Sequence, residues 1–196
     1  MPTGVALHDV RKQLFDAADR VLLRDGPSGL TSRAVTTEAA VAKGILHRHF
    51  ADFDAFLADF VMDRVDRMDA QAAALKDGAG KGEVIGNLAE ALTALFGSVA
   101  VAIVALVTFR DELRARLRES WPAGIPVLTE AGFMFEQYLT YERAHGRIAD
   151  DAPIDALAPT LIGAGHLLYA DRGAPPDAAT VRKMVTTVIG GYLCHD

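Results

Sequence analysis

The 196-residue chain has few of the features that mark secreted proteins. Its single cysteine, Cys194, cannot form an internal disulfide. The N-terminal sequence lacks the basic segment, apolar segment and cleavage site of a secretory signal. Aromatic residues make up only 7% of the chain, but hydrophobic residues make up 51%, enough for a sizeable core. These features predict a folded cytoplasmic protein.

Charged residues are missing from one long segment, residues 91–109 (ALTALFGSVAVAIVALVTF). This segment just reaches membrane-spanning length. However, it contains Gly97 and Ser98, and neither flank carries a basic cluster or an aromatic belt. Its β-branched residues would suit a strand, but the sequence offers no partner strand. We therefore predict a buried helix and no membrane partner.

Motifs for catalysis and for cofactor binding are also missing. The sequence has no nucleophile elbow, no phosphate-binding glycine loop and no clustered metal-ligand spacing. His47 and His49 lie two positions apart, so on a helix they point about 200 degrees apart and do not converge on a metal. We expect neither enzymatic activity nor a metal or cofactor.

Charge is unevenly distributed along the chain. The net charge is -6, but residues 1–50 carry seven basic and five acidic side chains, a local charge of +2 that leaves -8 for the remainder. This asymmetry suits a small DNA-facing module attached to an acidic body that phosphate repels.

Apolar residues recur at helical spacing along the whole chain, which predicts an all-α protein of about nine helices. Gly26 and Pro27 should end the first helix, while Thr31 and Asp52 should cap later helices. Segment 76–82 is rich in glycine and charge and is expected to be a flexible joint. The expected helices span residues 8–24, 31–39, 43–49, 52–75, 84–109, 110–120, 125–145, 153–171 and 177–193.

Residues 31–50 (TSRAVTTEAAVAKGILHRHF) predict two short helices joined by a tight turn, and here the chain resembles the TetR family of regulators. The resemblance implies an N-terminal three-helix helix-turn-helix domain over residues 1–52. It also implies a helical ligand-binding and dimerisation domain over residues 53–196. At the positions of the family's Ile-Ala, Ala-Gly-Val-Ser, Gly-Thr-Leu-Tyr and His-Phe, the chain has Val35-Thr36, Ala39-Ala40-Val41-Ala42, Gly44-Ile45-Leu46-His47 and His49-Phe50.

Four of the departures from the family pattern bear on DNA contact. His47 replaces the usual tyrosine, and Phe53 replaces a lysine that contacts phosphate in many relatives. Ala42 replaces the serine that would cap the recognition helix, and Ala40 replaces the turn glycine. These departures imply altered or weaker DNA contact. They leave open a ligand- or partner-binding protein with a vestigial helix-turn-helix that no longer binds DNA.

The predicted DNA-binding residues lie on or beside the two short helices, because a short helix fits the major groove and its neighbours reach phosphates. Lys43 and Arg48 are expected to reach phosphates or guanine edges, and Arg33, at the start of the first short helix, to donate to phosphates. The resemblance implies a phosphate contact for His49. The full set is Thr31, Ser32, Arg33, Lys43, Gly44, His47, Arg48 and His49.

The resemblance also implies a small hydrophobic ligand inside the C-terminal bundle and a homodimer on a palindromic DNA operator, with ligand binding releasing a repressor. Ligand candidates combine apolar bulk with a few polar tips: Phe96, Phe109, Trp121, Phe133, Met134, Tyr138, His166 and Tyr169. Apolar stripes on the last two helices would form the dimer interface or, equally, face the chain's own core. The interface candidates are Leu161, Gly165, Leu168, Met184, Val188 and Tyr192.

Overall fold

The computed structural model describes residues 4–170 and 174–194. These residues form eleven α-helices, one short 3-10 helix and an isolated β-bridge between Ile148 and Leu193, which confirms the all-α prediction. The chain divides into two compact units. Unit 1 comprises the described residues up to 64 and residues 102–125, and unit 2 comprises the described residues of 65–101 and from 126 onward. The domain boundary predicted after residue 52 stays a prediction.

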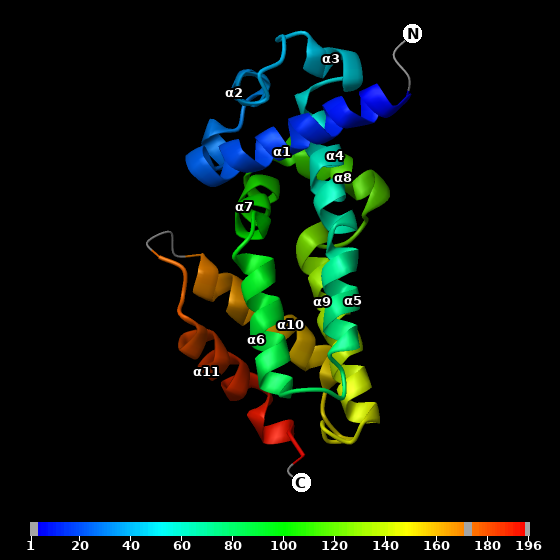
Figure 1. The fold of residues 1–196 in the computed structure, drawn as a ribbon, viewed down its shortest axis with the longest axis vertical. Coiled ribbons are helices and arrows are strands. Elements are labelled where there is room, and N and C mark those ends of the chain that lie inside the picture. Colours follow the sequence, from blue (N-terminus) through cyan, green and yellow to red (C-terminus); the bar gives the residue numbers. More distant parts are fainter. Residues whose placement is uncertain (1–3, 171–173, 195–196) are drawn as a thin grey trace. The chain divides into compact units, whose positions relative to one another are not determined.

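Figure 1 shows the helices in chain order. Most begin and end within a few residues of their predicted bounds. They are α1 (Gly4–Gly29), α2 (Ser32–Glu38), α3 (Ile45–His49), α4 (Phe53–Asp66), α5 (Met68–Asp77), α6 (Val84–Phe96), α7 (Ala100–Phe109), α8 (Asp111–Ser120), α9 (Pro126–Ala144), α10 (Ile154–Tyr169), α11 (Ala178–Ile189) and the 3-10 helix η1 (Gly190–Tyr192).

Two expected long helices are each broken in two, which explains why eleven are found and not about nine. The helix expected over 52–75 divides at Arg67, where neither glycine nor proline marks the break. The helix expected over 84–109 is interrupted after Phe96. There the Ser98 hydroxyl accepts a hydrogen bond from the Ala100 N–H (3.3 Å) at the start of α7. The β-branched segment is helical, as predicted.

The helix boundaries of unit 1 follow local sequence signals. Gly26 adopts φ 71°, a left-handed value that glycine tolerates, and ends the regular part of α1. The Thr31 hydroxyl accepts a hydrogen bond from the Ala34 N–H (3.1 Å) and caps α2. Asp52 does the same for the Ala55 N–H (2.7 Å) at the start of α4. All three signals were predicted from the sequence.

A cluster of five phenylalanines forms the core of unit 1. Phe56 of α4 is fully buried, and its ring centroid lies 5.6 Å from that of Phe15 in α1 and 5.0 Å from that of Phe50. Phe53 and Phe60 stack on opposite sides along α4, with centroids 5.6 and 6.4 Å from Phe56. The cluster joins α1, the α3–α4 connection and α4.

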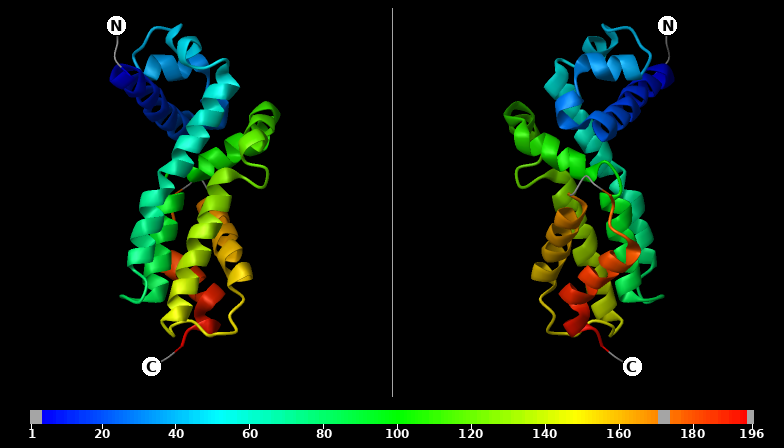
Figure 2. Two further views of the ribbon diagram at one scale, coloured as in Figure 1. Left: turned by 90° about the vertical axis from the view of Figure 1, so that its right-hand side faces the viewer. Right: turned by 90° about the vertical axis from the view of Figure 1, so that its left-hand side faces the viewer.

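Unit 2 is a bundle in which α10 packs against α6, α9 and α11, and α5 packs against α6 and α9 (Figures 1 and 2). Gly165 allows α10 to approach α6 closely, because a Cβ atom there would lie 2.7 Å from the Phe96 ring. Leu88, Leu92 and Phe135 are among the fully buried side chains. The bundle therefore has a continuous apolar core of its own.

The segment expected to be a flexible joint, residues 76–82, is an anchored turn within unit 2. The Asn87 amide donates to the Gly78 and Lys81 carbonyls (3.1 and 3.0 Å). The Gly80 N–H donates to buried Glu142 (3.2 Å), whose carboxylate also pairs with Arg147 (3.3 Å). The joint prediction was wrong because these anchors come from residues distant in sequence.

None of the described helices is by itself long and apolar enough to span a membrane. Only α6 and α7 taken together, across their break, meet the length and composition criteria.

Replacing Phe56 with alanine should lower the free energy of unfolding by about 3–5 kcal/mol, since it empties the centre of the aromatic cluster. Urea denaturation followed by circular dichroism measures this change. Leu23→Ala is the control, because Leu23 is 60% exposed and its truncation should cost no more than about 0.5 kcal/mol. Equal midpoints for the two variants would contradict the assigned core.

Candidate DNA-binding site

Within unit 1, helices α2 and α3 are joined by a tight turn. The Ala40 N–H donates to the Thr37 carbonyl (3.1 Å) and the Val41 N–H to the Thr36 carbonyl (3.0 Å). Ala40 itself has φ 52°, a left-handed value, at the position where the family has a glycine. That conformation costs a residue with a Cβ atom about 1 kcal/mol.

Helix α3 begins at Ile45, two residues later than predicted, with Gly44 at its N-cap and no side-chain cap. Leu46 is fully buried and fixes the inward face of the helix. His47 and Arg48 within the helix are exposed, as are Lys43 and Gly44 just before it. A Cβ atom on Gly44 would meet no atom within 4 Å, so the backbone is open to close approach there.

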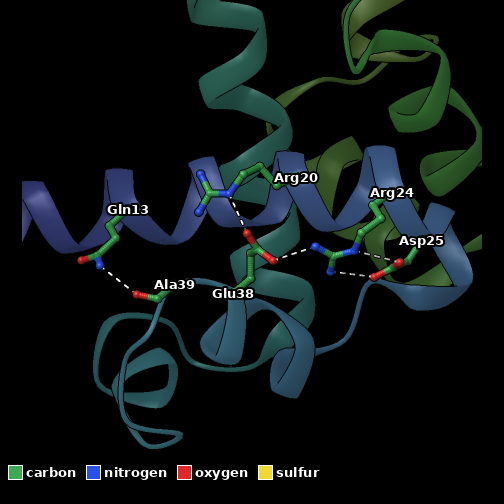
Figure 3. Close-up of polar contacts among 6 residues, drawn as sticks. All are labelled: Gln13, Arg20, Arg24, Asp25, Glu38 and Ala39. Carbon is green, nitrogen blue, oxygen red and sulfur yellow. Dashed lines mark hydrogen bonds and ion pairs between the residues drawn. The ribbon is translucent and has the colours of Figure 1, made fainter.

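A network of charged residues holds α2 against α1 (Figure 3). Glu38 of α2 accepts hydrogen bonds from Arg20 Nε (2.7 Å) and from Arg24 (2.8 Å). Arg24 also pairs with Asp25 (2.9 Å). Nearby, the Gln13 amide donates to the Ala39 carbonyl (2.8 Å). Hydrogen bonds from Arg24 and then Arg20 hold the pKa of Glu38 below its ordinary value.

Four of the seven cations in residues 1–50 are neutralised by carboxylates of unit 1. Two of them, Arg20 and Arg24, pair with Glu38. The others are Arg11, which pairs with Asp59 (2.7 Å), and Lys12, which pairs with Asp16 (2.8 Å).

Three cations remain, and they are the ones predicted to reach DNA: Arg33, Lys43 and Arg48. All three side chains are exposed, and none makes a hydrogen bond or ion pair with any residue that the structure describes. Within residues 1–50, the positive charge available to a ligand is thus concentrated on α2, the turn and α3.

The remaining predicted DNA-binding residues flank these cations. Ser32 is partly buried in the first turn of α2, while Thr31 uses its hydroxyl to cap that helix. His49 is partly buried at the end of α3, and its carbonyl accepts a hydrogen bond from Arg11 (3.4 Å). The structure brings all eight predicted residues into this one region of unit 1.

Phe53, in place of the family's lysine, is covered by an arginine from the α7–α8 junction. Arg110 lies over the Phe53 ring at 5.4 Å from its centroid and makes two hydrogen bonds with Asp54 (2.5 and 3.2 Å). Arg116 of α8 pairs with the capping Asp52 (2.8 Å). No sequence signal identified these contacts, because the partners lie more than fifty residues apart.

The predicted ligand-binding residues do not form one group. Phe96, His166 and Tyr169 lie together in unit 2, with the His166 and Tyr169 rings 6.0 and 5.9 Å from that of Phe96. Burial lowers the pKa of His166. Met134 and Tyr138 are buried on α9, and Phe133 is half exposed. Phe109, 85% exposed, and Trp121 belong to unit 1.

Sequence reasoning missed a groove of about 230 Å³ between α5 and α6 in unit 2. Small side chains create it, and alanines at helical spacing give no signal of a groove. Its lining residues are Gln71, Ala74, Leu75, Gly78, Asn87, Glu90, Ala91 and Ala94.

The predicted dimer residues fall into two classes. Leu161 is fully buried and Gly165 lies against Phe96, so contacts inside the chain already occupy both. Partly exposed positions are Leu168, Met184, Val188 and Tyr192. On α10, Leu167 is 76% exposed although it is a large apolar residue.

The fold and the α2–turn–α3 geometry define an all-helical protein with an N-terminal helix-turn-helix. Residues 14–59 match the family described as bacterial regulatory proteins, tetR family. Over this segment, the match confirms the resemblance to the TetR family that the sequence analysis stated. A comparison with curated protein sequences gives no match.

Solved structures extend the likeness in fold to nearly the whole chain. A TetR transcription regulator from Haloarcula marismortui is 14% identical, with a TM-score of 0.72 over 95% of this chain and 100% of that one. A TetR-family regulator from Rhodococcus sp. is 18% identical, with a TM-score of 0.68 over 94% and 98%. FadR from Bacillus subtilis in complex with stearoyl-CoA is 18% identical, with a TM-score of 0.66 over 94% and 99%. The chain has the fold of these regulators.

Glu38→Gln should lower the urea midpoint at pH 7, and the difference from the unaltered chain should shrink as the pH falls below about 4.5, the ordinary pKa of this carboxyl. The folded-state pKa is depressed, so the stabilisation is present above the ordinary pKa and is lost as the pH falls through the folded one. Exposed Glu119→Gln serves as the control in the same unit. A midpoint difference that stays constant from pH 7 to 3 would show that the ion pairs of Glu38 do not stabilise the fold.

Proposed function

We propose that the chain is a DNA-binding transcriptional regulator, a repressor whose dimer leaves a palindromic operator when a small molecule binds. The observation that carries the proposal is the set of three exposed, unpaired cations on α2, the turn and α3. The other cations of this module with described side chains are paired with carboxylates, so these three are the groups free to contact phosphate.

The shape of the module supports the same function. A short recognition helix enters the major groove, and residues at the start of the preceding helix reach the backbone. Here α3 presents His47 and Arg48, while Arg33 lies in the first turn of α2. Phosphate contacts dominate DNA affinity, so binding should weaken steeply with salt.

Arg48→Ala should weaken binding to the promoter region of the protein's own gene by about tenfold or more, as loss of a major-groove arginine contact does. Mobility shift and footprinting at low and moderate salt measure the effect. Lys12→Ala is the matched control, since Lys12 carries the same charge but pairs with Asp16. Its affinity should change by less than about twofold.

The footprint also decides between the two functions considered. A protected near-palindrome with half-sites about 34–36 Å apart would establish dimeric reading. No protection at any salt would instead favour a ligand- or partner-binding protein whose helix-turn-helix no longer binds DNA. Ala42, His47 and Phe53, which replace the serine cap, the tyrosine and the lysine of the family pattern, favour this alternative.

We place the dimer interface on the outer faces of α10 and α11. Along α10 the exposed positions Ala156, Thr160, Gly163 and Leu167 follow one helical face, and Gly163 has open space around its Cβ position. An exposed stripe of small residues that ends at one large apolar side chain allows close packing against a symmetry-related copy.

Leu167→Arg should convert the dimer to a monomer, because it places a charge within the proposed apolar contact. Light scattering after size exclusion measures the mass, and circular dichroism checks the fold. Thr140→Arg, at an exposed position of α9, should leave the mass unchanged. A dimeric Leu167→Arg variant would exclude this face.

The proposed ligand is small and hydrophobic, and binds in unit 2. The Phe96–His166–Tyr169 cluster and the α5–α6 groove supply apolar surface with a few polar groups. The FadR structure, which has the same fold, contains stearoyl-CoA. A compound that raises the melting temperature and also releases operator DNA would support this input, while compounds that bind without changing operator affinity would contradict it.

A further inference from the structure

The hydrogen-bonding groups on the reading surface, defined here as residues 40–48, are mainly donors. Lys43 and Arg48 can only donate hydrogen bonds. His47, between them on the outward face, carries a donor and at most one acceptor. The other exposed residues of the surface, Ala40, Ala42 and Gly44, have no polar side-chain atoms. No Asn, Gln, Asp or Glu occurs in this segment.

The carboxylates closest in sequence to this surface are already occupied. Glu38, just before the turn, binds Arg20 and Arg24. Asp52, just after α3, accepts from the Ala55 N–H and pairs with Arg116. Neither carboxylate is therefore free to accept a hydrogen bond from a base.

The four bases differ in what they show to such a surface. In the major groove guanine presents two adjacent acceptors, N7 and O6, while adenine and cytosine each present an amino donor that needs an acceptor. Thymine presents a single acceptor beside a methyl group. A donor-rich surface with an arginine fork matches guanine best.

We propose that the operator half-site presents guanine to α3, with Arg48 and His47 donating to its N7 and O6 atoms. Leu46 fixes the rotation of the helix, because it is fully buried on the opposite face. Lys43 flanks the pair and contacts phosphate. The inference rests on the proposed DNA-binding function and specifies the base that it reads.

The test begins with selection of bound duplexes from a pool of randomised double-stranded DNA by the full chain. Guanine should be enriched at one or more positions of each half-site. At each enriched position, dG is then replaced by 7-deaza-dG, which lacks the N7 acceptor, or by deoxyinosine, which keeps N7 and O6 and loses only a minor-groove amino group. The first replacement should weaken binding about 5- to 100-fold, as loss of a specific base contact does, and the second by less than about threefold.

Two protein variants separate base reading from general effects on the duplex. Arg48→Ala should remove most of the difference between dG and 7-deaza-dG, because the reading group is then absent. Lys81→Ala, which removes an exposed charge from unit 2, should preserve it.

The possible failures are distinguishable. Absence of binding to every duplex would overturn the proposed DNA-binding function and, with it, this inference. Salt-dependent binding without guanine enrichment, or an equal affinity for dG and 7-deaza-dG, would overturn the inference alone. Enrichment of adenine in place of guanine would also overturn the inference. It would indicate that the base is read by the acceptor nitrogen of His47.

Discussion

The packing of α4 on α1 through the phenylalanine cluster is the constraint on which the rest of unit 1 depends. Phe50 follows α3 directly, and its ring meets Phe56 edge-on at 5.0 Å, so the end of the recognition helix is fixed to the core of the unit. Arginines cover the cluster: Arg11 lies over Phe50 at 4.5 Å and Arg64 over Phe60 at 5.2 Å. Each guanidinium also pairs with a carboxylate, so its charge is compensated while it stacks on the ring.

The same pairing explains how an acidic protein can present a basic surface. The net charge of -6 would repel DNA if it were evenly distributed. In unit 1 the carboxylates instead neutralise specific arginines and lysines, as Glu38 does for Arg20 and Arg24. Arg33, Lys43 and Arg48 have no such partners among the described residues, so local potential and net charge have opposite signs.

Local signals predicted much of this architecture, while contacts between distant residues could not be predicted. The caps Thr31 and Asp52, the stop at Gly26 and the turn at Ala40 depend on neighbouring residues, and each is found where the sequence placed it. The anchored turn at 76–82 depends on Glu142, more than sixty residues away. For the candidate site, the unpaired cations could be named from their positions, but their lack of partners appears only in the fold.

The contacts between residues 110–116 and the start of α4 bear on how the proposed ligand signal would reach α3. Arg110 makes two hydrogen bonds with Asp54 and stacks on Phe53, and Arg116 pairs with Asp52, so residues 110–116 are attached to the first turn of α4 at three points. An isolated exposed ion pair contributes little, but a two-point arginine–carboxylate contact combined with stacking is stronger and more directional. Displacement of this segment would therefore move the start of α4. Phe50 and Phe56 would pass that movement to α3, because their rings are in contact.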